Sequence, residues 1–186
     1  MTSDAGRPGE TRQRAAHRGR AALVGLAAFL GAVFIAMLIA GLATRVGVNG
    51  WYAEASKPFW TPPDWVFTPV WTALYALMAV AAWLVWRRSG WHGARLALTL
   101  FFVQLGLNVL WPILFFSFKL TGWASLEILL LVLAILATAW RFDRHSRIAA
   151  ALLLPYAVWT GYAASISIAV WLMMPGAEAA GGAPPA

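Results

Sequence analysis

The sequence predicts an all-α membrane protein, a bundle of five transmembrane helices. Only 11% of the residues are charged and 61% are hydrophobic, whereas soluble domains average about 25% charged residues. The mean hydropathy is +0.70. The apolar residues also gather in five long runs, and each run can cross a hydrocarbon core that takes about 20 helical residues. The chain length allows one domain.

The five runs define the expected spans. They lie at residues 21–44, 66–86, 96–118, 120–140 and 148–174, and only the fourth contains a charged residue, Glu127. Helices alone satisfy their own backbone over such lengths in lipid. The first run exceeds the apolar core of a signal peptide, so it is read as the first helix of the 21–174 domain. Residues 1–20 and 175–186 are expected to be disordered tails, because they hold few large apolar side chains.

Basic residues predict the orientation of the bundle. The N-terminal tail and the second and fourth connections carry eleven of the 14 lysines and arginines, and the other side has only Arg45, Lys57 and Lys119. Positive residues remain inside, so the N-terminus is expected in the cytoplasm and the C-terminus outside. The arginines are spread over three flanking segments, and no nucleic-acid partner is therefore expected despite the net charge of +7.

Polar residues inside the spans are few. Gln104 and Asn108 lie four residues apart and share one helix face. Buried amides normally face the bundle interior, where they join helices or contact a ligand. For Gln104 the favoured role is to join helices, and Asn108 is equally consistent with joining helices and with contacting a ligand. For Glu127 a structural hydrogen bond is favoured over a role in ligand or proton handling. No metal site is expected, because the chain has no cysteine and its three histidines are scattered in polar flanks.

Prolines and tryptophans mark one end of the bundle. The loop at residues 45–65 and the start of the next span read WYAEASKPFWTPPDWVFTPVW from Trp51 to Trp71. Proline fixes φ and stiffens such a loop, and inside a span it bends the helix. Bends at Pro69 and Pro112 open space in which pockets occur. Tryptophans near span ends fit an interfacial belt, whereas Trp71 and Trp159 lie further inside.

Four blocks of sequence resemble the tryptophan-rich sensory protein and translocator protein (TspO) family. In order they are WYAEASKPFWTPPDWVFTPVWTALYALM, QLGLNVLWPILFF, GWASLEILLL and LLLPYAVWTGYAAS. The resemblance implies a five-helix protein of the bacterial cytoplasmic membrane, surrounded by membrane lipid and often homodimeric. It also implies a porphyrin-type ligand, protoporphyrin IX or haem, no obligatory cofactor, and a role as sensor, carrier or scavenger.

The same resemblance implies a ligand pocket beneath a lid formed by residues 45–65. Phe59, Trp60 and Trp65 are expected to seal its inner surface, and Asp64 to cap the second span. Lys57 is the nearest candidate cation for a ligand carboxylate, but its extension to the lipid headgroups is the favoured expectation. The implied ligand-binding residues are Tyr52, Trp60, Trp65, Phe67, Trp71, Asn108, Trp111, Trp123, Trp159 and Ala163.

Two other functions stay open at this point. Some relatives degrade protoporphyrin in light and oxygen, and the two tryptophans implicated correspond to Trp71 and Trp159, which would then be catalytic. A transporter of a small solute, lipid or sterol is the other alternative. The animal sterol pattern is missing because no basic residue follows Arg147, and Thr99 and Val103 replace small residues used for dimer contact in some relatives. Whether this chain forms the homodimer therefore stays open.

Overall fold

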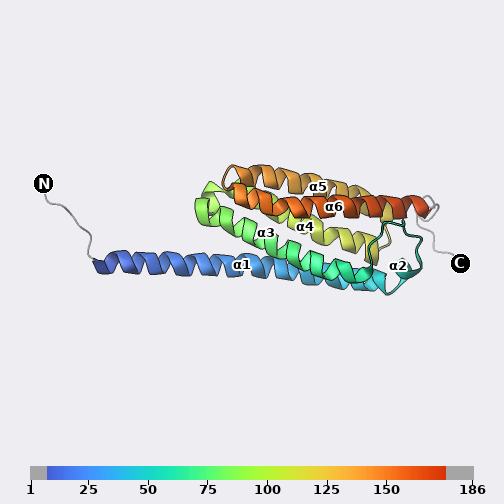
Figure 1. The fold of residues 1–186 in the computed structure, drawn as a ribbon, viewed down its shortest axis with the longest axis horizontal. Helices are drawn as coiled ribbons and strands as arrows, with labels where there is room; N and C mark the ends of the chain where they lie inside the picture. Colours follow the sequence, from blue (N-terminus) through green and yellow to red (C-terminus); the bar gives the residue numbers. More distant parts are fainter. Residues whose placement is uncertain (1–7, 175–186) are drawn as a thin grey trace.

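The computed structural model describes the backbone of residues 8–174 and the side chains from residue 19 onward, and this part is almost wholly helical (Figure 1). Five helices are long and apolar enough to cross a membrane, over Gly19–Val48, Asp64–Gly93, Arg95–Ser117, Thr121–Asp143 and Arg147–Met173. The predicted fold class, with five helices of membrane length, is confirmed. Each of these helices contains its apolar run or lies within one residue of it, and the second continues seven residues past the predicted end, to Gly93, because the run sets how much helix lipid can cover.

The elements follow one another along the chain with short connections. They are α1 (Pro8–Val48), α2 (Trp51–Glu54), α3 (Asp64–Gly93), α4 (Arg95–Pro112), the π-helix η1 (Ile113–Ser117), α5 (Thr121–Asp143) and α6 (Arg147–Met173). The five long helices close a ring in the order α1, α3, α6, α5, α4 and back to α1. The segment after α1, with α2, lies at the end of the ring where α6 ends (Figure 1).

The N-terminal boundary differs from the prediction. α1 begins at Pro8, so residues 8–20 are helical rather than disordered, and Figure 1 shows this part of α1 extending beyond the other helices. Proline is favoured at the first helical position, and the alanines and arginines that follow are good helix formers. Residues 1–7 and 175–186, which complete the two predicted tails, lie outside the described residues.

Two prolines shape the entrance to the bundle. Pro63 precedes α3 with φ −57°, and Asp64 is the first helical residue and makes no capping hydrogen bond, so the predicted cap is wrong. The carboxylate of Asp64 still lies in the first turn, where the helix dipole favours a negative charge. At the other side Pro112 ends α4, and the chain continues as the wider π-helix η1, which tertiary contacts with α1 and α5 hold in place.

Small and branched side chains fill the middle of the ring. Ala79, Ala82 and Val85 of α3 are fully buried beside Leu98 and Phe101 of α4. Small residues at helix contacts let the backbones approach closely, which drives helix association in lipid where the hydrophobic effect between helices is absent. These closely packed residues of α3 and α4 belong to the same buried cluster as Tyr75 and Tyr156, which are described next.

Candidate functional site

A hydrogen-bonded group of three residues crosses the interior of the ring. The side-chain oxygen of Asn108 on α4 accepts from the Tyr75 hydroxyl of α3, and its amide nitrogen donates to the Tyr156 hydroxyl of α6 at 2.9 Å. The exposed fractions of these side chains are 3%, 4% and 0%. Asn108 therefore joins three helices, which confirms that it faces the interior. Gln104, one turn away, is also buried and donates only to the Met78 sulfur at 3.8 Å.

Aromatic rings surround these tyrosines on the side of α3 and α6. The Trp71 ring lies 5.8 Å from the Tyr75 ring and 6.2 Å from the Tyr156 ring. The Trp159 ring lies 5.9 Å from the Phe67 ring in an edge-to-face arrangement. We call these five residues the α3–α6 aromatic cluster. Trp71 and Trp159 are half-buried, so the prediction that they lie inside their spans, and not in an end belt, is confirmed.

Buried donors and acceptors without partners are present in this half of the molecule. The indole nitrogens of Trp111 and Trp159, the Thr160 hydroxyl and the Gln104 side-chain oxygen are buried and make no hydrogen bond with the described residues. Buried polar groups are nearly always paired in folded proteins, so each unpaired group needs a reason. A ligand that accepts hydrogen bonds would explain why these two buried indole N–H groups have no partner among the described residues.

The predicted lid at residues 45–65 is too long, because α1 continues to Val48 and α3 begins at Asp64. The lid is therefore residues 49–63, and two side chains hold it to the bundle. The Trp51 indole nitrogen donates to the Phe116 carbonyl of η1 at 3.0 Å, and the Tyr162 hydroxyl of α6 donates to the Trp60 carbonyl. The Tyr52 ring lies 5.8 Å from Phe115 and 5.3 Å from Phe116. The lid is therefore attached at both η1 and α6, across the end of the ring.

One cation lies at the base of the lid. The Lys57 ammonium nitrogen is 4.5 Å from the centroid of the Tyr52 ring, a cation–π contact. Burial, and secondarily the carboxylate of Asp64, raise the pKa of Tyr52 to about 12, so this hydroxyl is neutral at physiological pH. Lys57 thus lies against an aromatic face within the lid, with no carboxylate partner among the interactions described.

The structure does not gather every predicted residue. Phe59 and Trp65 have exposed fractions of 95% and 75%, so they point outward and do not seal the inner surface of the lid. Trp60, at 39%, contributes its carbonyl to the lid contact. Trp123 is 65% exposed on the outer face of α5, whereas Ala163, at 6%, is buried beside the α3–α6 aromatic cluster. The outward direction of Trp65 and Trp123 follows from how α3 and α5 are rotated about their axes, whereas Phe59 lies in the lid, between α2 and α3.

Glu127 also differs from its prediction. Its exposed fraction is 6%, and both carboxylate oxygens are without a hydrogen-bond partner among the described residues, so the expected structural hydrogen bond is wrong. The side chain lies at the edge of a surface hollow of about 420 Å³. This hollow is lined by Leu114, Leu120, Trp123, Leu126, Glu127 and Leu130. It lies outside the α3–α6 aromatic cluster, beside η1 and α5.

The fold and this region define a class: a small integral membrane protein whose five helices enclose a polar and aromatic interior beneath a tryptophan-containing lid. The model of the TspO/MBR family matches residues 23–172. The chain belongs to this family.

Relatives in all three domains of life support the assignment. A "Tryptophan-rich protein TspO" of Archaeoglobus fulgidus is 39% identical over 146 residues, covering 76% of this chain and 94% of the relative. The human "Translocator protein" is 40% identical over 65% of this chain and 73% of its own length. A "Tryptophan-rich sensory protein" of Cereibacter sphaeroides is 36% identical over 63% of this chain and 72% of its own length.

Proposed function

We propose that this protein binds a porphyrin-type ligand, protoporphyrin IX or haem, beneath the lid, and acts as a sensor, carrier or scavenger of tetrapyrroles. The observation that carries the proposal is the pair of buried indole N–H groups, on Trp111 and Trp159, that find no acceptor within the described part of the chain. A porphyrin offers an extended ring face for aromatic stacking and two carboxylates as acceptors. The family names of the relatives, sensory protein and translocator protein, agree with such a role.

Binding requires the lid to move, and its attachments make this inexpensive. The two side-chain hydrogen bonds described for the lid end on backbone carbonyls, at Phe116 and Trp60. A single hydrogen bond contributes roughly 0.5–1.5 kcal/mol net. Displacement of the lid would expose the α3–α6 aromatic cluster, and Lys57, which moves with the lid, would then be available to a ligand carboxylate at the edge of the site.

Titration of the purified protein with protoporphyrin IX in darkness tests the proposal. Tryptophan fluorescence should be quenched with a micromolar dissociation constant, corresponding to about −8 kcal/mol. Asn108→Ala should weaken binding because it releases Tyr75 and Tyr156 from their shared partner. Trp86→Phe, at the opposite end of α3, is the control. Equal quenching in both variants would mean nonspecific partitioning and would contradict the proposal.

A second candidate function is the light- and oxygen-dependent degradation of protoporphyrin. It is favoured by the contact of Trp71 with Tyr75 and Tyr156, which places an oxidisable indole beside two phenols. We expect Trp71→Phe and Trp159→Phe to retain most of the dark affinity but to lose a distinct product under illumination in air. Product masses and the Soret band provide the measurement. Bleaching no different from that of free porphyrin would leave binding as the function.

The localisation is part of the same proposal. We infer a bacterial cytoplasmic membrane with the N-terminus inside, supported by the gathering of arginines on one side of the spans. The lid would then face outward and receive its ligand from that side. A homodimer, which the resemblance implies, is also proposed and can be checked by light scattering of the purified protein in detergent.

A further inference from the structure

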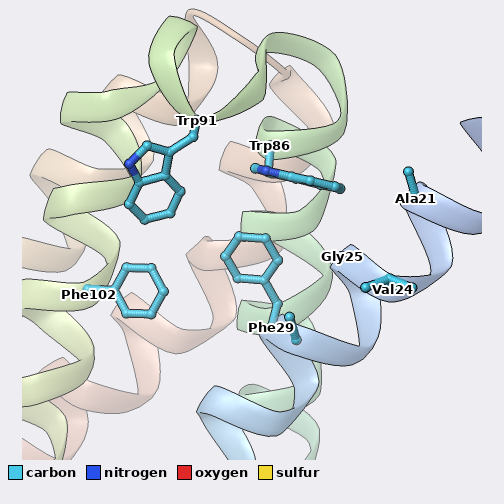
Figure 2. Close-up of a pocket in the computed structure, with 8 residues that line it drawn as sticks. Ala21, Val24, Gly25, Phe29, Trp86, Trp91 and Phe102 are labelled. Carbon is cyan, nitrogen blue, oxygen red and sulfur yellow. The ribbon is translucent and has the colours of Figure 1, made fainter.

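A second hollow lies at the end of the bundle opposite the lid, between α1, α3 and the start of α4. Its volume is about 440 Å³, within the range of roughly 300–1,000 Å³ typical of small-molecule sites. The lining consists of apolar and aromatic side chains, shown in Figure 2: Ala21, Val24, Gly25, Ala28, Phe29, Trp86, Trp91 and Phe102. We call it the α1 hollow.

The α1 hollow exists because one ring is pressed against α1. A Cβ atom at Gly25 would collide with the Trp86 indole, so only glycine lets this ring lie against the helix backbone. The Phe29 ring lies 6.3 Å from both the Trp86 and Phe102 rings, and Trp91 lies 6.0 Å from Phe102. Figure 2 shows these rings around one space, open beside α1. The walls offer carbon surface and no hydrogen-bonding side chain apart from the two indoles.

Three arginines lie close in the sequence to residues that line this apolar space, although none of them is among its lining residues. The Arg87 guanidinium lies 4.4 Å from the Trp83 ring centroid, and the Trp83 indole nitrogen donates to the Ala22 carbonyl of α1 at 2.8 Å. This connection places Arg87 beside the stretch of α1 that lines the hollow. Arg20 precedes Ala21 in the same turn of α1 and is exposed. Arg95 is exposed four residues after Trp91.

The segments that form the walls of the hollow contain no acidic residue. Residues 19–48 and 86–118 hold no aspartate or glutamate, and the acidic residues on the elements nearby are Glu10 in the first turn of α1 and Asp143 at the end of α5. Among the cations at this end, Arg88 donates to the His145 carbonyl at 3.2 Å, whereas no such bond is described for Arg20, Arg87 or Arg95. Basic pockets between transmembrane helices at the cytoplasmic face suit anionic lipid headgroups.

We propose that the α1 hollow binds one anionic phospholipid, with an acyl chain against Phe29 and Trp86 and the phosphate against Arg20 and Arg87. Each buried methylene of a lipid chain contributes about 0.8 kcal/mol, and the arginines supply the preference for negative charge. The site lies at the opposite end of the bundle from the lid and shares no residue with the α3–α6 aromatic cluster, so its occupant does not compete with the porphyrin-type ligand.

Brominated lipids test the proposal directly, because bromine on an acyl chain quenches a tryptophan that it touches. The full-length protein is placed in nanodiscs of phosphatidylcholine containing a small fraction of brominated phosphatidylglycerol or, separately, brominated phosphatidylcholine. Quenching should favour phosphatidylglycerol, and the excess should fall in Trp86→Phe and disappear in Trp86→Phe, Trp91→Phe, which removes both tryptophans that line the hollow. The double variant Arg20→Gln, Arg87→Gln should lower that preference about tenfold, and Ala28→Leu, which fills the hollow, should reduce quenching by both lipids.

The matched control is a second pair of arginines on the same predicted side. The Arg141 and Arg144 guanidinium carbons lie 4.8 and 4.3 Å from the Trp140 ring centroid, and neither residue borders the α1 hollow. The double variant Arg141→Gln, Arg144→Gln should retain the preference measured at Trp86. If both double variants lost the preference for phosphatidylglycerol equally, the preference would come from the general surface charge of this end, and the proposal would be overturned. It would also be overturned if Ala28→Leu altered the oligomeric state and left lipid quenching unchanged, since a second copy would then occupy the hollow.

Discussion

Tryptophans gather at both ends of the bundle, but their surroundings differ between the two ends. At the lid end, the indole N–H groups of Trp111 and Trp159 are buried and have no acceptor among the described residues, next to a hydrogen-bonded group centred on Asn108. At the opposite end, which we call the arginine-bordered end, Trp86 and Trp91 line a hollow of apolar and aromatic side chains, and Arg20 and Arg87 directly precede or follow lining residues in the sequence. Tryptophan content alone therefore does not locate a site. What distinguishes the ends is whether polar atoms accompany the rings, and this predicts a polar ligand at one end and a lipid at the other.

The largest expected effect concerns which end of the bundle faces the cytoplasm. If the arginine-bordered end faces the cytoplasm, a reporter fused to the C-terminus and active only in the cytoplasm should be silent. The reason is the strong bias of basic residues toward the inner side. The same reporter at the N-terminus provides the positive control. Strong activity from the C-terminal fusion would place the lid inside and reverse the proposed assignment of the two ends.

Asn108→Ala should give the next largest effect, on stability. The substitution leaves the hydroxyls of Tyr75 and Tyr156 without the partner they share in a buried region. An unsatisfied buried group costs about 1–3 kcal/mol, although such bonds average about 0.6 kcal/mol in membrane proteins. We expect a loss of about 1–3 kcal/mol in the free energy of unfolding, measured by denaturation in mixed micelles. Tyr75→Phe, which removes one donor only, should cost less.

Much of the fold could be predicted from the sequence because lipid makes helix the only choice for long apolar runs. Asn108 could be placed in the interior for a related reason, since a buried amide needs partners. The outward direction of Trp65 and Trp123 could not, because it depends on how each helix is rotated about its axis and an indole is tolerated on either side. Composition alone predicts a disordered tail here, whereas the helical start at Pro8 follows from the preference of proline for the first helical position.

Gly25→Ala should produce an intermediate effect at the arginine-bordered end. The added methyl group collides with the Trp86 indole, so the ring must move and the contact between α1 and α3 loosens. Forcing extra volume into a packed contact typically costs about 1–3 kcal/mol. Thermal unfolding in detergent provides the measurement. Gly31→Ala is the control, because no neighbouring atom lies within 4 Å of a Cβ at Gly31, and it should be neutral or slightly stabilising. Equal midpoints for the two variants would contradict the close approach of Trp86 to α1.

Glu127→Gln should have the smallest effect on stability, and its sign is informative. The carboxyl group is buried, and neither oxygen has a partner among the described residues, so it contributes no bond that the substitution could break. Glutamine keeps the shape and removes an ionisable group from a membrane span, where such groups are costly unless functional. The midpoint of thermal unfolding should therefore be unchanged or rise. The corresponding gain in the free energy of unfolding should be at most about 1 kcal/mol. Leu130→Ala, in the wall of the same hollow, controls for packing and should lower it. A clear loss of stability in Glu127→Gln would mean that the carboxylate has a partner outside the described residues. The prediction would then be wrong.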